Sequence, residues 1–147
     1  MSSADFRIAI VAARFNERFV GQLLEGALAA LERMGTSRED VRVVRVPGAF
    51  ELPLAAKRLA ESGGYDAIIA LGSVIRGETS HFEHVSRAAA DGLERVSLDY
   101  GIPVGFGVLT TETPEQAAAR AGGDKGNIGF DAAMAAVEMA SVLRDIQ

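Results

Sequence analysis

The sequence lacks cysteine, has only two lysines, and contains neither a long apolar run nor a block of basic residues. Without cysteine, disulfides, thiolate metal sites and cysteine nucleophiles are excluded. No apolar run approaches the roughly 18 residues that span a bilayer, and the N-terminus carries no signal-peptide pattern, so we expect a cytoplasmic protein with no membrane segment. The formal net charge of −5, without a basic patch, argues against nucleic acid as a partner.

Several familiar cofactor and catalytic motifs are missing as well. No G-x-G-x-x-G follows the first apolar run and no Walker lysine motif occurs, which excludes these two modes of nucleotide binding. The same run ends without an aspartate, which argues against a phospho-receiver domain. Lys57 lies beside Arg58 in a predicted helix, on a face typical of solvated charges, and this position argues against a Schiff-base lysine.

Four apolar segments alternate with segments of helical periodicity. The predicted strands are residues 6–13, 41–46, 65–71 and 102–109, and the predicted helices run from about 17 to 34, 50 to 61, 80 to 100, 114 to 122 and 130 to 144. The first strand is almost continuously apolar, which is typical of a strand buried on both faces of a parallel sheet. The alternation predicts an α/β fold, in which one domain over residues 1–147 forms a four-stranded parallel sheet with helices on both faces.

Capping residues mark several of the predicted helix ends. Asn16 and Thr113 are candidate N-caps, and Thr113 is followed by a proline at the first helical position. Ser80 and Glu83 form the capping-box pattern Ser-x-x-Glu. Gly101 follows the last periodic residue of the third helix and is expected to end it.

Residues 71–81 carry most of the chemistry in this chain. Two glycines that allow tight turns are followed by an acid, two hydroxyls and a histidine, just where a helix begins. Ligands of open parallel sheets bind beyond the carboxyl ends of the strands, and helix N-termini attract anions. The stretch is therefore a candidate anion site beside a proton-transfer group, although Glu78, Thr79 and Ser80 are equally compatible with plain helix capping.

His81 is the candidate for acid–base chemistry, because imidazole exchanges protons near neutral pH. A helix-capping or merely exposed histidine is the alternative interpretation. His84 follows one helical turn later, but no third ligand is evident, so we do not expect a metal site.

Other candidates lie at the remaining strand ends. Phe15 sits in a polar loop that no core periodicity explains, where it suits stacking on a planar ring or plugging of the loop. Arg120 offers either a guanidinium for an anion or a solvated helix charge. Phe50 and Phe106 are better explained as core or wall residues, and Glu51 as an acid favoured at a helix start.

Five segments, taken in order and at their spacing, resemble the 6,7-dimethyl-8-ribityllumazine synthase family of riboflavin biosynthesis. They are residues 14–16, 47–53, 72–82, 106–112 and 120–122, and the resemblance extends from residue 8 to about 144. It implies a flavodoxin-like three-layer sandwich. It also implies a transferase that condenses 5-amino-6-(D-ribitylamino)uracil with 3,4-dihydroxy-2-butanone 4-phosphate, without metal or cofactor, and releases phosphate and water.

The resemblance also implies roles for individual residues. His81 is expected to transfer protons, while Glu78, Thr79 and Arg120 are expected to bind phosphate. A larger set is expected to contact the pyrimidine and its ribityl chain: Phe15, Ala49, Phe50, Glu51, Ser73, Val74, Ile75 and Phe106.

Family members form pentamers or icosahedral capsids of sixty subunits, with each active site between neighbouring subunits. The resemblance therefore implies a homo-oligomer in which Phe106 and Arg120 come from the neighbour, with riboflavin synthase as a candidate partner. By the same resemblance, the turn between the last two helices, which is short and carries no insertion, permits the icosahedral form. One departure concerns Ile128, because the family often has a lysine there; Ile128 cannot make the lysine's polar contact, and Lys125 lies three residues earlier.

Two functions of other classes compete with this interpretation. A flavodoxin-like binding module would hold a flavin or ribityl ligand without turnover. A purely structural shell protein would have no need of His81 beside Thr79.

Overall fold

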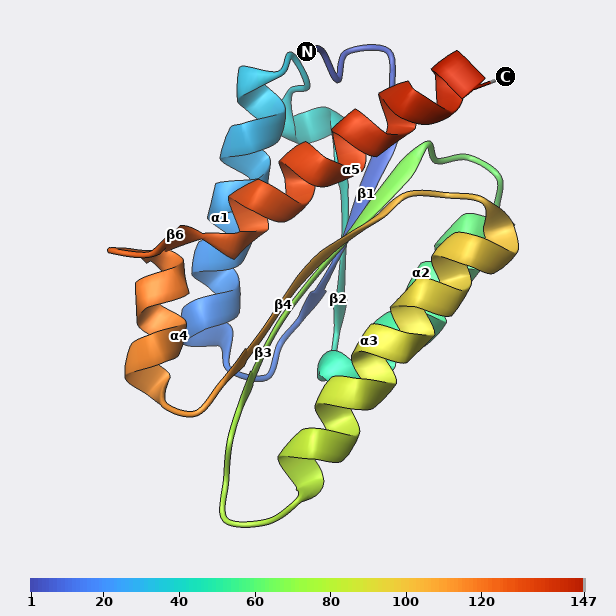
Figure 1. The fold of residues 1–147 in the computed structure, drawn as a ribbon. Coiled ribbons are helices and arrows are strands. Elements are labelled where there is room, and N and C mark those ends of the chain that lie inside the picture. The colour runs from blue at the N-terminus through green and yellow to red at the C-terminus, as the bar shows by residue number, and fades with distance from the viewer. Residues whose placement is uncertain (147) are drawn as a thin grey trace.

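The computed structural model describes residues 1–146 and contains a parallel sheet between two layers of helices (Figure 1). The strands of the sheet are β1 (Ile8–Ala13), β2 (Arg42–Val46), β3 (Ala67–Ile75) and β4 (Val104–Thr111). The helices are α1 (Glu17–Arg33), α2 (Leu52–Glu61), α3 (His81–Tyr100), α4 (Pro114–Arg120) and α5 (Ile128–Ile146). The short elements are the 3-10 helices η1 (Arg38–Asp40) and η2 (Ala49–Glu51) and a hairpin of β5 (Ala121–Gly123) and β6 (Gly126–Asn127).

The strand order in the sheet is β2-β1-β3-β4, and every neighbouring pair is parallel. This order matches the first four strands of the flavodoxin-like arrangement. Helices α1 and α5 cover one face of the sheet, and α2 and α3 cover the other (Figure 1). The predicted three-layer α/β fold with four parallel strands is therefore confirmed.

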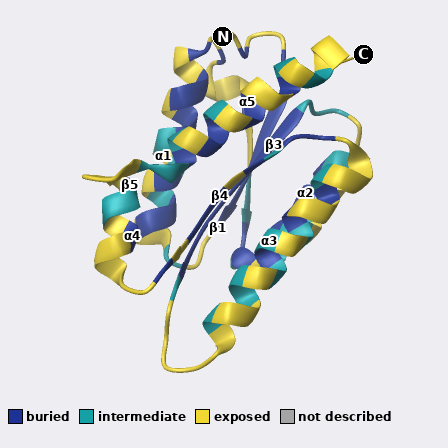
Figure 2. Cartoon of the chain, in the orientation of Figure 1, coloured by how far each residue is buried: buried dark blue, intermediate teal, exposed yellow. Residues whose placement is uncertain are grey.

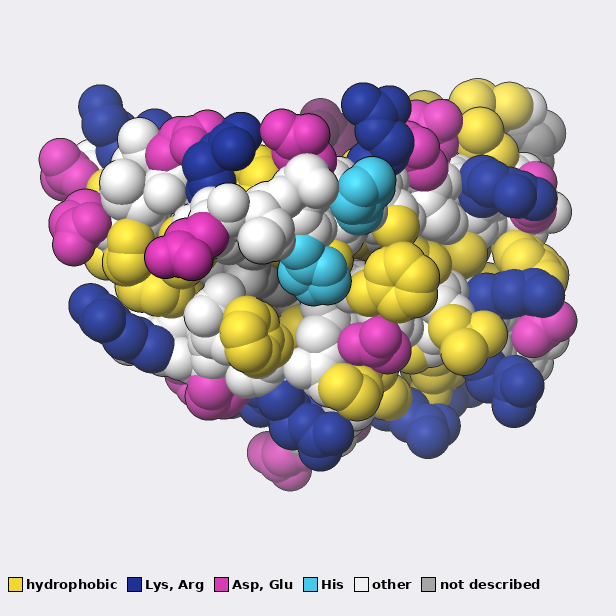
Figure 3. All heavy atoms as spheres, turned by 90° about the horizontal axis from the view of Figure 1, so that it is seen from below, with side chains coloured by type: hydrophobic (Ala, Val, Ile, Leu, Met, Phe, Trp, Pro, Cys, Tyr) yellow, Lys and Arg dark blue, Asp and Glu magenta, His cyan; other side chains and the backbone are white. Residues whose placement is uncertain are grey.

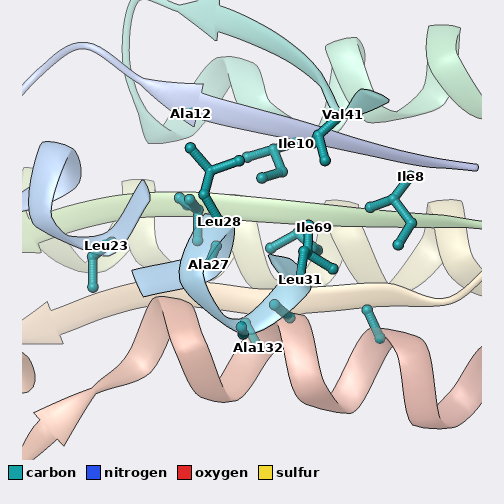
Figure 4. Close-up of a cluster of buried hydrophobic side chains, with 14 of the residues drawn as sticks. Ile8, Ile10, Ala12, Leu23, Ala27, Leu28, Leu31, Val41, Ile69 and Ala132 are labelled. Atoms are coloured by element: carbon teal, nitrogen blue, oxygen red, sulfur yellow. The ribbon is translucent and has the colours of Figure 1, made fainter. Parts of the chain in front are cut away.

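The side chains of β1 alternate between two hydrophobic cores, which explains its continuous apolar sequence. Ile8 and Ile10 lie in the core beneath α1 and α5, together with Leu23 and Leu31 (Figure 4). Val11 belongs to the core beneath α2 and α3. All six residues of β1 are buried, so the strand has no polar face to present to water.

Each helix of the outer layers has one buried and one exposed face (Figure 2). Helix α3 buries Ala89, Leu93 and Val96, which follow the predicted helical spacing. Lys57 of α2 is exposed, as predicted. Within residues 1–146, no helix has both the length and the apolar character that crossing a membrane requires.

Except for the ends of β1 and β2, the strand boundaries differ from the prediction by one to four residues, and one of these differences affects the site. Strand β3 continues to Ile75 rather than ending at residue 71, because residues 72–75 pair in register with residues 108–111 of β4. Gly72 therefore lies in a strand and not in a turn, with the side chain of Leu52 packed against its missing Cβ position. Strand β4 begins at Val104, after Pro103, which has no N–H to contribute to a ladder.

Only one of the predicted N-caps is confirmed. Thr113 Oγ1 accepts a hydrogen bond from the N–H three residues later, at 3.1 Å. The capping box at Ser80 is wrong: the Ser80 side chain makes no capping bond, and Glu83 instead pairs with the Arg76 guanidinium at 3.4 Å. Asn16 also makes no capping bond, because its side chain bonds to the Ser73 carbonyl oxygen of β3.

The hairpin of β5 and β6 occupies the glycine-rich turn between the last two predicted helices. Asn127 at its end caps α5, since its Oδ1 accepts a hydrogen bond from the Phe130 N–H at 3.0 Å. The same side chain donates through Nδ2 to the carbonyl oxygen of Gln22 in α1, also at 3.0 Å. Helix α5 consequently begins at Ile128, two residues before its predicted start.

Close packing of α5 on α1 leads to a first prediction. A Cβ on Gly129 would overlap the carbonyl oxygen of Leu23 and lie 2.9 Å from its Cα. We expect Gly129→Ala to lower the free energy of unfolding by about 1–3 kcal/mol, measured by urea denaturation. Gly21→Ala is the matched control: its Cβ would meet only Glu17 Oε1 at 3.6 Å, and better helix propensity should stabilise the protein by about 1 kcal/mol. Equal stability of the two variants would contradict the close approach.

Candidate active site

A cavity of about 710 Å³ lies at the carboxyl ends of β1 and β3, between η2 and the beginning of α3. Nine of the twelve predicted site residues line it: Phe15, Ala49, Phe50, Glu51, Ser73, Val74, Ile75, Thr79 and His81. Figure 3 looks onto this end of the molecule, where the two histidines lie side by side among hydrophobic side chains. The position agrees with the rule that ligands of parallel sheets bind beyond the carboxyl ends of the strands.

Two aromatic side chains of the cavity are largely exposed. Phe15 is 71% exposed and Phe50 is 61% exposed, although both line the same concave surface. The loop that carries Phe15 is tied to the end of β2, because the Phe15 N–H donates to the Pro47 carbonyl oxygen at 3.0 Å. Exposed rings around a cavity offer flat apolar surface to a planar ligand.

Glu51 lies close to Phe15 across Gly48. A Cβ added to Gly48 would be 3.3 Å from Glu51 Oε1 and 4.0 Å from Phe15 Cβ. The missing side chain therefore lets a carboxylate and an aromatic ring approach the same part of the cavity. This pairing suits a ligand with both a planar ring and hydroxyl groups that can donate to the carboxylate.

Arg76 holds the loop between β3 and α3 in place. Its Nε lies 2.7 Å from Glu112 Oε2, its Nη2 lies 3.4 Å from Glu83 Oε1, and its guanidinium stacks over the Phe82 ring at 5.1 Å. The Arg76 N–H also donates to the Thr111 carbonyl oxygen at 2.9 Å. Because two carboxylates already neutralise this guanidinium, we do not assign it to binding an anion.

The remainder of the loop, residues 77–80, is exposed and leads into the N-terminus of α3. Thr79 Oγ1 accepts a hydrogen bond from the His81 N–H at 3.4 Å, and both side chains line the cavity. The 20-residue helix directs its positive dipole end toward this space. A hydroxyl, an imidazole and a helix N-terminus thus meet at one wall, which can receive an anion next to a proton donor.

His84 lies one turn after His81 and lines the same cavity. Nevertheless, residues 1–146 contain no group of three or more His, Cys, Asp or Glu side chains placed to hold a metal ion. The arrangement supports proton transfer by an imidazole more readily than metal binding.

Three predicted residues do not line the cavity. Glu78 is exposed in the loop, and Phe106 is 46% exposed on β4, the edge strand of the sheet. Arg120 ends α4, where its Nη1 donates to the Gln116 carbonyl oxygen at 3.1 Å. As a result, no lysine or arginine of the described chain lines the cavity. An anion bound there would meet backbone N–H groups and the positive end of the α3 dipole, but no ammonium or guanidinium group of the described lining.

Ile128 also lies away from the cavity. It begins α5 and packs, partly buried, against the core beneath α1. Lys125 is exposed in the hairpin, where its N–H donates to the Ala119 carbonyl oxygen at 2.8 Å. Neither residue reaches the cavity in its own chain.

Seven residues of the lining are not among the predicted site residues: Asn16, Pro47, Gly48, Gly77, Phe82, His84 and Val85. Phe82, His84 and Val85 belong to the beginning of α3, and His84 and Val85 follow His81 at spacings of three and four residues, which place side chains on one face of a helix. In the sequence, Phe82 and Val85 fit the apolar periodicity of the helix, and His84 is considered only as a metal ligand. Asn16 was predicted only as a helix cap.

Ser73 provides a second prediction. Its hydroxyl is buried and is the one buried side-chain polar atom in residues 1–146 that lacks a hydrogen-bond partner. Because an unsatisfied buried hydroxyl is costly, we expect Ser73→Ala to leave the free energy of unfolding unchanged or to raise it by about 1 kcal/mol. Thr111→Val on the neighbouring strand is the control and should be destabilising by a similar amount, since Thr111 Oγ1 donates to the Thr113 carbonyl oxygen at 3.1 Å. Marked destabilisation by Ser73→Ala in thermal or urea unfolding would show that this hydroxyl has a partner.

Comparison with known proteins shows the family of this chain. The family model of 6,7-dimethyl-8-ribityllumazine synthase matches residues 5–144. A protein of Syntrophus aciditrophicus (strain SB) named 6,7-dimethyl-8-ribityllumazine synthase is 54% identical over 140 residues, which cover 95% of this chain and 91% of that relative. The chain therefore belongs to the 6,7-dimethyl-8-ribityllumazine synthase family and is a transferase of riboflavin biosynthesis.

Proposed function

We propose that the protein condenses 5-amino-6-(D-ribitylamino)uracil with 3,4-dihydroxy-2-butanone 4-phosphate to give 6,7-dimethyl-8-ribityllumazine, phosphate and water. The observation that carries this proposal is a single cavity that joins exposed aromatic rings, a carboxylate, an imidazole and a helix N-terminus. The reaction proposed here uses no metal or cofactor.

The two substrates occupy different walls of the cavity. Phe15 and the segment from Ser73 to Ile75 hold the planar pyrimidine, and Phe50 and Glu51 contact the ribityl chain, where the carboxylate accepts hydrogen bonds from hydroxyls. The phosphate lies by Glu78 and Thr79, at the N-terminus of α3, where backbone N–H groups and the helix dipole favour negative charge.

The main contribution of the protein to this reaction is to position the two substrates. An aromatic amine and a ketone react readily once they are held together, so proximity supplies a large part of the rate. His81 transfers protons during imine formation and during elimination of phosphate. Stabilisation of the leaving phosphate by the helix N-terminus and by a guanidinium lowers the barrier to its departure.

Direct assay of both products tests the function. When the two substrates are mixed with the protein, lumazine fluorescence and free phosphate should rise together, and phosphate release should require the pyrimidine. Absence of product at high enzyme concentration would contradict the proposal.

His81→Ala tests the role of the imidazole in that assay. We expect kcat to fall on the order of 10²-fold without reaching zero, because positioned reactants retain the advantage of proximity. His84→Ala is the control: it removes the other histidine of the cavity and should change kcat only a few-fold. Complete loss of activity in a folded His81→Ala protein would show that proximity contributes less than we propose.

We further propose that the active site is shared between subunits of a pentamer, or of a capsid of sixty subunits, with Phe106 and Arg120 supplied by the neighbour. The absence of lysine and arginine from the described lining supports this arrangement, because the phosphate needs a counter-charge. Phe106 is exposed and Arg120 is partly exposed, so both side chains are accessible to a second subunit. The cytoplasmic location and riboflavin synthase as a partner stay predictions.

Complementation between two impaired variants tests the shared site. Arg120→Ala should raise the KM for the butanone phosphate about 10- to 100-fold, as expected for the loss of hydrogen bonds to a charged group. Coexpression of His81→Ala and Arg120→Ala chains should restore activity, since mixed assemblies contain sites with both native side chains. If mixed assemblies form, as judged by light scattering and differential tags, yet regain no activity, the site lies within one chain.

A further inference from the structure

The turn between β1 and α1 contains a strained residue that helix formation does not explain. Asn16 has φ 60 and ψ 42, and it is the only non-glycine residue of positive φ within residues 1–146. Left-handed backbone is unfavourable for residues with a Cβ, although asparagine tolerates it better than most. Its side chain makes no capping bond to α1, so local capping does not account for this conformation.

The Asn16 side chain instead bonds to β3. Its Nδ2 donates to the Ser73 carbonyl oxygen at 2.7 Å, across 57 residues of sequence. Strand β1 ends at Ala13 and its last paired position is opposite Leu71, whereas β3 continues to Ile75. The amide of Asn16 therefore bonds to β3 two residues beyond Leu71, the last β3 residue that is paired with β1.

This bond joins the two walls between which a planar ligand would lie. On one side, Phe15 directly precedes Asn16 and exposes 71% of its surface, so few packing contacts hold its ring in place. On the other side, Ser73 begins the segment that completes the cavity at the end of β3. The main chain before the turn is already fixed, since the Phe15 N–H bonds to the Pro47 carbonyl oxygen. The Asn16 bond fixes the turn after the ring.

We infer that Asn16 is a positioning residue for Phe15, and that its left-handed backbone and its bond to Ser73 set the distance between the Phe15 ring and the end of β3. This inference rests on the proposed function, in which that gap receives the pyrimidine. Asn16 does not take part in proton transfer. It acts through Phe15, and its contribution is confined to the pyrimidine half of the site.

Two substitutions separate the contribution of the left-handed backbone of Asn16 from that of its side-chain amide. Asn16→Gly keeps easy access to positive φ but loses the donor to Ser73. Asn16→Asp keeps the size and the tolerance of left-handed backbone, but it places a carboxylate oxygen against the Ser73 carbonyl oxygen, and two acceptors repel. Glu17→Gln is the control at the next position, because Glu17 pairs with the partly buried Arg45 on the β2 side of the turn, away from the Asn16–Ser73 bond.

The test is titration calorimetry of the full-length assembled protein with 5-amino-6-(D-ribitylamino)uracil alone, together with KM values for both substrates. Asn16→Gly should weaken pyrimidine binding about tenfold and raise its KM in parallel, and Asn16→Asp should do so more strongly. The KM for the butanone phosphate should change less than twofold in both variants. Glu17→Gln should bind like the wild type.

A double-mutant cycle with Phe15→Ala identifies the route of the effect. If Asn16 acts through the ring, Asn16→Gly should add no loss of pyrimidine affinity in the Phe15→Ala background. An equal loss in both backgrounds, or wild-type affinity in folded Asn16→Gly, would overturn the inference. So would loss of the cooperative thermal transition in both Asn16 variants, since the residue would then be purely structural.

The same experiment separates this inference from the proposed function. If the wild type binds no pyrimidine, the function fails and the inference fails with it. If the wild type binds and turns over both substrates while the Asn16 variants behave as the wild type does, the function stands and only the positioning role is lost.

Discussion

The pairing of β3 with strands on both sides is the constraint on which the rest of the structure depends. Its residues 67–74 are buried, and it continues along β4 after β1 has ended. Because its end extends past β1, the last residues of β3 form the floor of a cavity and not the middle of a sheet. The turn after β1 then covers that end, held by the bond from Asn16 to the Ser73 carbonyl oxygen. The two walls of the site are therefore formed where the carboxyl ends of β1 and β3 meet, at the centre of the same sheet that supports the fold.

The lack of lysine and arginine in the described cavity lining is the reason for proposing a site shared between subunits. Arg76 is the first residue of the loop between β3 and α3. Its guanidinium is neutralised by Glu83 and Glu112, so it holds the loop in place and is not free to bind an anion. The described lining contains an imidazole, a hydroxyl and a helix N-terminus but no cationic side chain from lysine or arginine. This division suits the proposed reaction, in which one chain positions the reactants and a neighbouring chain completes the charge around the phosphate.

Much of the fold and of the site followed from local patterns. The continuous apolar run of β1 indicated a strand buried on both faces, and Thr113 with its proline indicated the start of α4; both are confirmed. The same local rules failed at Ser80, because the Arg76 charge holds the Glu83 side chain that a capping box would use. They failed again at Gly72, where pairing with β4 extends a strand through a glycine that looked like a turn residue.

The sequence by itself determined the order of strands and helices, the parallel sheet and the set of residues at its carboxyl edge, because periodicity and capping act over a few neighbouring residues. Its match to a family of known enzymes determined the kind of chemistry. Only the tertiary structure decided which of those residues face one another. Asn16 looks like a helix cap in the sequence, yet its amide bonds to a strand 57 residues away. Contacts of that kind depend on where one strand ends relative to its neighbour, and no local pattern encodes that register.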